Sequence, residues 1–221
     1  MIRRISHELK HHVPFTFAGT VVGAAIMIAM TLAKAPHEVS HVLFAIAHPT
    51  HVLLSAMVTA AMYRLHGRGR WWATAIIGYV GSIGIATLSD SLIPYVGEAL
   101  LGLPRAHVHA GFIELWYLVN PLALAGVAIG YFWPTTKFPH AGHVLLSTWA
   151  SLMHMMMAVT EFHAATIAAL TAFLFVAVWL PCCTSDIVFP LLFVPKALRP
   201  PCGHCHSSSG ESEPDESPPT H

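Results

Sequence analysis

The chain has 221 residues, of which 55% are hydrophobic and only 10% are charged. A soluble domain carries about 25% charged residues, so this composition excludes an ordinary soluble protein and predicts an integral membrane protein. Eleven basic and eleven acidic residues give a formal net charge of zero, which argues against a nucleic-acid partner. The seventeen histidines are unusual, because histidine is costly in lipid and tends to face a bundle interior or a cavity.

The apolar runs predict an all-α membrane protein with about six spanning helices. The expected spans are, in order, about 15–32, 37–63, 71–88, 111–133, 141–160 and 164–180. Pro49 interrupts the second run, which predicts a kinked helix or an extra short helix over 37–47 followed by a span. Ser89 and Asp90 are expected to end the third span. Residues 91–104 are too short to cross a membrane and predict a re-entrant or interfacial segment.

Two short stretches of the sequence are nearly the same. Residues 48–55 and 140–147 both have the pattern H-x-x-H-V-L-L-S, and both begin an apolar run. A proline with small residues precedes each stretch and Ser-Asp-x-x-x-Pro follows each, in segments 14–23, 121–130, 89–94 and 185–190. Three matches in the same order predict an ancient duplication. The alternative is coincidence, because apolar helices share a small alphabet.

The basic residues predict the orientation of the chain in the membrane. With six spans and a cytoplasmic N-terminus, nine Lys and Arg residues fall in cytoplasmic segments and two in outer segments. We therefore expect a multi-pass protein of the cytoplasmic (inner) membrane with both termini in the cytoplasm. Each repeat, 1–104 and 105–199, then has three spans, so the two halves lie in opposite orientations, as in many secondary transporters. Residues 200–221 are rich in Pro, Ser and Glu and predict a disordered tail.

The paired histidines indicate a site for a divalent transition metal. Two histidines three residues apart share a helix face and can hold one ion together. Imidazole suits such metals and a carboxylate can complete the shell, so zinc is the first expectation, with Fe, Ni, Cu and Co as alternatives. The predicted ligands are His48, His51, His140, His143, Asp90 and Asp186. The competing interpretation is that these histidines lie near lipid headgroups.

Further candidate ligands extend this site. His41 falls in the same sector of its helix as the first histidine pair. His154 and Glu161 share a face with His143, which predicts either an ion or proton relay or a satisfied polar seam between helices. The tail contains C-x-x-C with interleaved histidines, which is typical of a small metal-loading site, although a purely disordered tail is the alternative. Its candidate ligands are Cys202, His204, Cys205 and His206.

These patterns predict a transporter or permease for a divalent transition metal, with the lipid bilayer and the metal ion as partners. A homo-oligomer is compatible with the sequence. A b-type haem protein is one alternative, because His37 and His51, like His140 and His154, lie 14 residues apart, close to four helical turns.

A membrane-embedded metal-dependent hydrolase is another alternative. It needs an open metal position and a general base, for which Glu114 and Glu161 are candidates. The sequence contains no H-E-x-x-H, no G-x-S-x-G and no phosphate-binding glycine loop. Transport is therefore preferred to catalysis.

Overall fold

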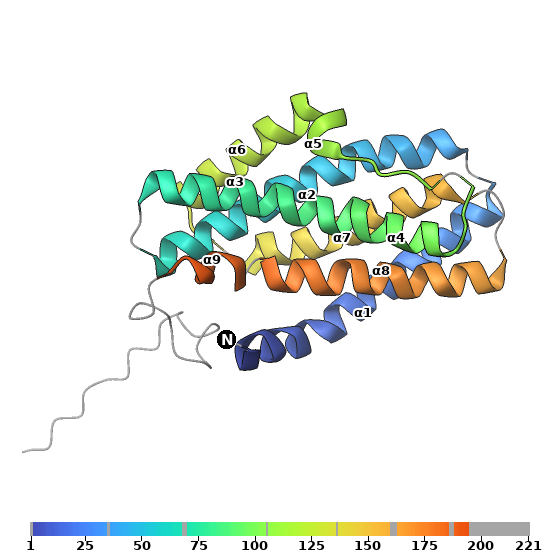
Figure 1. Ribbon diagram of the computed structural model, residues 1–221, viewed down its shortest axis with the longest axis horizontal. Helices are drawn as coiled ribbons and strands as arrows, with labels where there is room; N and C mark the ends of the chain where they lie inside the picture. Colours follow the sequence, from blue (N-terminus) through green and yellow to red (C-terminus); the bar gives the residue numbers. More distant parts are fainter. Residues whose placement is uncertain are drawn as a thin grey trace, which may run out of the picture.

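Figure 1 shows the computed structural model of the chain, which is helical wherever the described residues have regular structure. The structure describes residues 2–34, 36–67, 70–104, 106–135, 137–159, 163–185 and 188–194. Of residues 2–12, 15, 137–139 and 183–185 it describes the backbone alone. The predicted tail lies outside the described residues.

The helices lie side by side along the long axis of the molecule (Figure 1). They are α1 (Ile2–Leu32), α2 (His37–His66), α3 (Trp71–Thr87), the π turn η1 (Leu88–Leu92), α4 (Ile93–Leu100), α5 (Gly111–Glu114), α6 (Trp116–Phe132), α7 (Lys137–Ala158), α8 (Ala164–Ser185) and α9 (Val188–Leu192). The helices that carry the two histidine motifs, α2 and α7, pack against each other in the middle. On one side α1 packs against α7 and α8, and on the other α6 packs against α2 and α3.

Within the described residues, three helices are long and apolar enough to cross a membrane, namely His37–His66, Trp71–Leu100 and Ala164–Cys182. Two shorter apolar helices are Thr16–Leu32 and Trp116–Phe132. These lengths and compositions indicate a membrane protein.

The distribution of side chains agrees with a membrane protein. The inner face of α7 is polar, with His143, Ser147, Ser151 and His154 almost fully buried. Outward-facing side chains of α3 are large and apolar, among them Ile76. Buried polar groups beside an apolar core, together with large apolar side chains on the outside, suit a helix bundle in lipid.

The segment 37–47, expected as an extra short helix, is the first part of a continuous α2 that runs through Pro49. A proline inside a helix removes one backbone hydrogen bond, and neighbouring groups in a packed bundle can compensate for it. The next residue, Thr50, donates its hydroxyl to the carbonyl of Ile46 at 2.7 Å. Packing on both sides of α2 therefore overrides the proline signal.

The expected end of a span at Ser89–Asp90 is wrong, because the helix continues from Trp71 to Leu100 through the π turn η1. Pro94 explains the wide turn, since it has no N–H to donate to the carbonyl four residues before it. The amide of Ile93 bonds instead to the carbonyl of Leu88, five residues back. Asp90 thus lies inside a continuous helix that is long and apolar enough to cross a membrane.

The segment that turns back into the molecule comes later than the expected 91–104. After α4 the chain turns at Gly102, whose positive φ of 65° suits glycine. Residues 106–110 then run toward the middle of the long axis as non-helical chain (Figure 1). Ser91 donates its hydroxyl to the carbonyl of His109 at 2.6 Å, which fixes this segment beside the π turn.

The Ala-Gly-x-x-x-Gly segments are places of close helix approach. A Cβ on Gly126 of α6 would overlap the backbone of Leu53 and the side chain of Ala56 on α2. A Cβ on Gly19 of α1 would lie 3.4 Å from the hydroxyl of Thr148 on α7. Small residues at such crossings let helix backbones pack closely in a membrane.

Candidate functional site

Asp90 is the centre of the candidate site and is completely buried in η1. Its Oδ2 accepts hydrogen bonds from Nδ1 of His48 at 2.9 Å and Nδ1 of His51 at 2.6 Å. Its Oδ1 accepts from the hydroxyls of Ser89 at 2.7 Å and Ser147 at 3.1 Å. A buried carboxylate needs such partners, and this one holds both imidazoles of the first motif in place.

The second ring nitrogen of His51 is left to bind something else. Because Nδ1 of His51 donates to Asp90, its Nε2 carries the lone pair, and this atom is buried with no hydrogen-bond partner within the described part of the chain. The ring of His143 packs edge-on against the ring of His51, with centroids 4.5 Å apart. Cys182 of α8 donates its thiol to Ser147 Oγ at 3.2 Å.

Two overlapping groups of side chains could hold a metal ion. One consists of His48, His51 and Asp90, and the other of His51, His143 and Cys182; within each group the ligand atoms lie within 4.8 Å of one another. His51 belongs to both. A carboxylate that orients a histidine whose other nitrogen binds metal is a common arrangement around zinc. The thiol adds a soft ligand that suits zinc or copper better than magnesium or calcium.

His48 is positioned from both sides. A Cβ on Gly111, the first residue of α5, would overlap the imidazole of His48. The ring of Phe44, one turn earlier on α2, stacks on His48 with centroids 5.2 Å apart and an interplanar angle of 13°. Glycine at 111 therefore lets the returning chain come directly against the histidine.

The structure brings four of the predicted ligands together and separates others. His48, His51, Asp90 and His143 meet at the centre. His140 lies one turn from His143, with ring centroids 6.2 Å apart, and is partly exposed.

Two predicted ligands belong to another part of the molecule. His154 pairs with Glu98, and His41 is exposed beside His109 with ring centroids 6.4 Å apart. The predicted relay face of α7 is thus divided between two clusters, because His143 lies beside His51 whereas His154 bonds to Glu98. The remaining candidates, Asp186, Glu161, Cys202, His204, Cys205 and His206, lie outside the described residues.

Sequence reasoning missed Ser147, Glu98 and Gly111 as parts of these clusters. Ser147 is the last residue of the second motif, and an acidic residue within an apolar stretch, such as Glu98, is itself a signal. The close approach of Gly111 to His48 has no comparable sequence signal.

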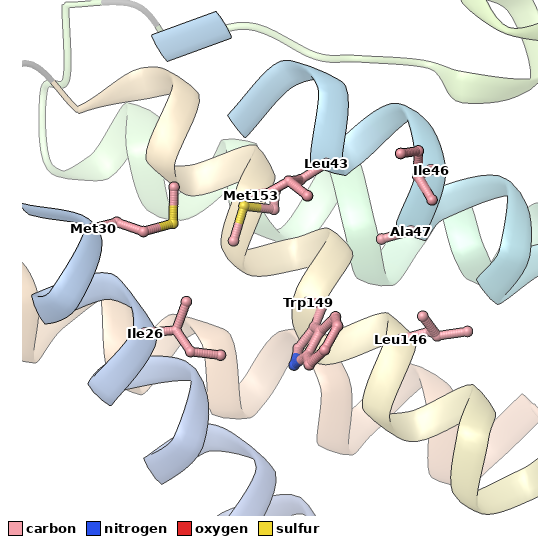
Figure 2. A pocket seen from close by; sticks show the side chains of 8 residues that line it. All are labelled: Ile26, Met30, Leu43, Ile46, Ala47, Leu146, Trp149 and Met153. Atoms are coloured by element: carbon pink, nitrogen blue, oxygen red, sulfur yellow. The ribbon is translucent and has the colours of Figure 1, made fainter. Parts of the chain in front are cut away.

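A pocket of about 270 Å³ lies between α1, α2 and α7, away from the histidines. Figure 2 shows its lining, which consists of aliphatic, methionine and tryptophan side chains, including Ile26, Leu43, Trp149 and Met153. None of its lining residues is ionisable. Such a lining suits hydrocarbon rather than a cation, so the candidate metal site is the buried polar cluster.

Comparison with protein-family models, with curated proteins and with solved structures gives no match to this chain. The site is therefore interpreted from its own chemistry.

Proposed function

We propose that the chain is a membrane transporter for a divalent transition metal ion, zinc first, bound between α2 and α7. The observation that carries this proposal is the central cluster, in which His48, His51, Asp90 and His143 converge in the interior of an apolar helix bundle. Ionisable groups at such depth are costly and mark ion pathways. Imidazole, carboxylate and thiol together match zinc and its neighbours.

An inverted duplication supports transport over static binding. Corresponding helices, α1 with α6 and α2 with α7, run in opposite directions along the long axis (Figure 1). Equivalent glycines make equivalent contacts across the halves: Gly126 approaches Ala56, and Gly19 approaches Thr148. Transporters built from inverted repeats place the substrate site where the repeats meet, and His51 meets His143 at this place.

The membrane and its orientation complete the proposal. The helix ends at His66, Trp71, Phe132 and Lys137, which adjoin part of the predicted cytoplasmic charge, lie at the same end of the molecule (Figure 1). By the charge bias this end faces the cytoplasm of the inner membrane, with both termini on that side. The haem and hydrolase alternatives stay predictions, and no contact among the described residues favours either of them over transport.

The test is zinc flux into proteoliposomes that contain the purified full chain. Asp90→Asn should reduce zinc affinity by about 10- to 100-fold, the usual effect of losing a carboxylate that orients metal-binding histidines, and should slow flux at low zinc. Glu38→Gln, at an exposed carboxylate in the first turn of α2, is the matched control and should transport normally. Equal flux through the wild-type and Asp90→Asn proteins would contradict the proposal.

A further inference from the structure

A second buried carboxylate and imidazole form a pair in the same bundle. Nδ1 of His154 on α7 donates to Oε1 of Glu98 on α4 at 2.8 Å, and both side chains are about 1% exposed. Nε2 of His154 and Oε2 of Glu98 are buried and have no hydrogen-bond partner among the described residues. Burying polar atoms without hydrogen-bond partners costs free energy, so we expect a ligand at this pair.

The pair repeats the construction of the central site. In both places a carboxylate on the continuous helix 71–100 binds Nδ1 of a histidine, Asp90 with His51 and Glu98 with His154. In both places Nε2 of that histidine is buried without a hydrogen-bond partner in the described ranges. Two sites with the same construction are expected to take the same class of ligand.

A chain of polar side chains connects the pair to the surface. The ring of His109 lies 5.3 Å from the ring of His154, and the ring of His107 lies 5.1 Å from that of His109. Nδ1 of His109 donates to Glu114 at 3.1 Å, and the exposed fractions of these two side chains are 22% and 42%. The segment 106–110 that carries both histidines is non-helical, and such backbone occurs at membrane depth only where it is packed in protein or lines a watery cavity.

One aromatic ring separates the pair from the central site. Phe44 stacks on His48 with centroids 5.2 Å apart and contacts His154 edge-on at 5.7 Å. The two clusters therefore follow one another along the bundle with Phe44 between them.

We propose that Glu98 and His154 form a second site for a divalent transition metal ion, in series with the central site. Glu98 orients His154 so that its Nε2 faces the ion, and the ring of His109, 5.3 Å from that of His154, lies on the surface side of the pair. The ion passes Phe44 between the two sites. Multiple sites of moderate affinity are what passage of an ion requires. This inference rests on the proposed transport of the same ion through the central site.

The test measures bound zinc per chain by equilibrium dialysis and metal analysis on the purified full-length protein in detergent. The wild-type protein should bind two equivalents. Glu98→Gln and His154→Gln should each lose the zinc equivalent of the second site and bind the other at unchanged affinity. Asp90→Asn should instead weaken zinc binding at the central site. Glu38→Gln should bind two equivalents like the wild type.

Two variants that should keep the fold make the test decisive. Glu98→Gln retains a carbonyl that accepts from His154, and His109→Gln lies on non-helical chain, so a folded protein is expected from both. His109→Gln should weaken one equivalent about tenfold. Unchanged zinc content in all three variants, or a single equivalent in the wild type, would overturn the second site. Unchanged zinc content together with slower transport in Glu98→Gln would identify the pair as a proton carrier, and this result would also overturn the second metal site.

The same measurements separate this failure from failure of the proposed function. If the second-site variants bind like wild type while Asp90→Asn loses zinc, only the second site is wrong. If Asp90→Asn also binds like wild type, the central site is wrong as well.

Discussion

The two H-x-x-H-V-L-L-S motifs have the same pattern but different surroundings. In the first, both His48 and His51 are buried and bonded to one carboxylate. In the second, His143 is buried and His140 is partly exposed. The first motif lies in the middle of the 30-residue α2, whereas His140 lies in the first turn of α7. Position along a helix therefore decides what an identical motif contributes.

The comparison shows that a duplicated sequence does not produce a symmetric site. The predicted site gives equal roles to all four histidines. The structure gathers both histidines of the first motif and one of the second, and it adds Ser147 and Cys182. The following predictions test whether the two motifs differ in binding as they do in burial.

The largest effect is expected from His51→Ala, because His51 belongs to both candidate groups. It should remove most of the zinc bound at the central site, and so should His143→Ala, since losing one of about four ligands leaves a poorly closed site. The double variant should be little worse than either single variant, because residues that act on one ion are not additive. Zinc counts on the four purified proteins measure this. If each single variant loses part of the bound zinc and the double variant loses the sum, the two motifs form independent sites instead.

A smaller effect is expected from Gly111→Ala. The added Cβ would overlap the imidazole of His48, so this ring must leave its place between Gly111 and Phe44. Zinc affinity should fall about tenfold, as for loss of a positioning contact near a metal. Isothermal titration with zinc measures it, and Gly84→Ala is the control, since a Cβ on Gly84 meets nothing within 4 Å. Equal affinity in both variants would show that His48 is not a ligand.

The smallest effect is expected from His140→Ala. A partly exposed side chain in the first turn of α7 should contribute little to a closed site, so zinc affinity should change by less than about threefold. His48→Ala, at the equivalent position of the first motif, is the matched comparison and should lose much more. Equal losses in the two variants would restore the symmetric four-histidine site and remove the difference described above.

Much of this arrangement could be predicted from the sequence. Hydropathy predicts the apolar helices, and the repeated motif predicts that His51 and His143 meet. The local sequence predicts a helix break at Pro49 and a helix end at Ser89–Asp90. Both helices continue through these residues, because neighbouring helices bury them. Glu98 was overlooked because its segment was interpreted as an interfacial piece. Contacts between distant segments, such as Gly111 with His48, depend on the path of the returning chain and leave no local pattern.

The π turn η1 sets the register between two parallel helices. On α7, Ser147 and His154 are seven residues apart, which is close to two helical turns. Their partners Asp90 and Glu98 are eight residues apart, which in a regular α-helix would turn Glu98 about 80° away from Asp90. A π turn holds about one residue more than an α turn and absorbs this difference. A single inserted residue is therefore sufficient to let one helix present two carboxylates to the same neighbour.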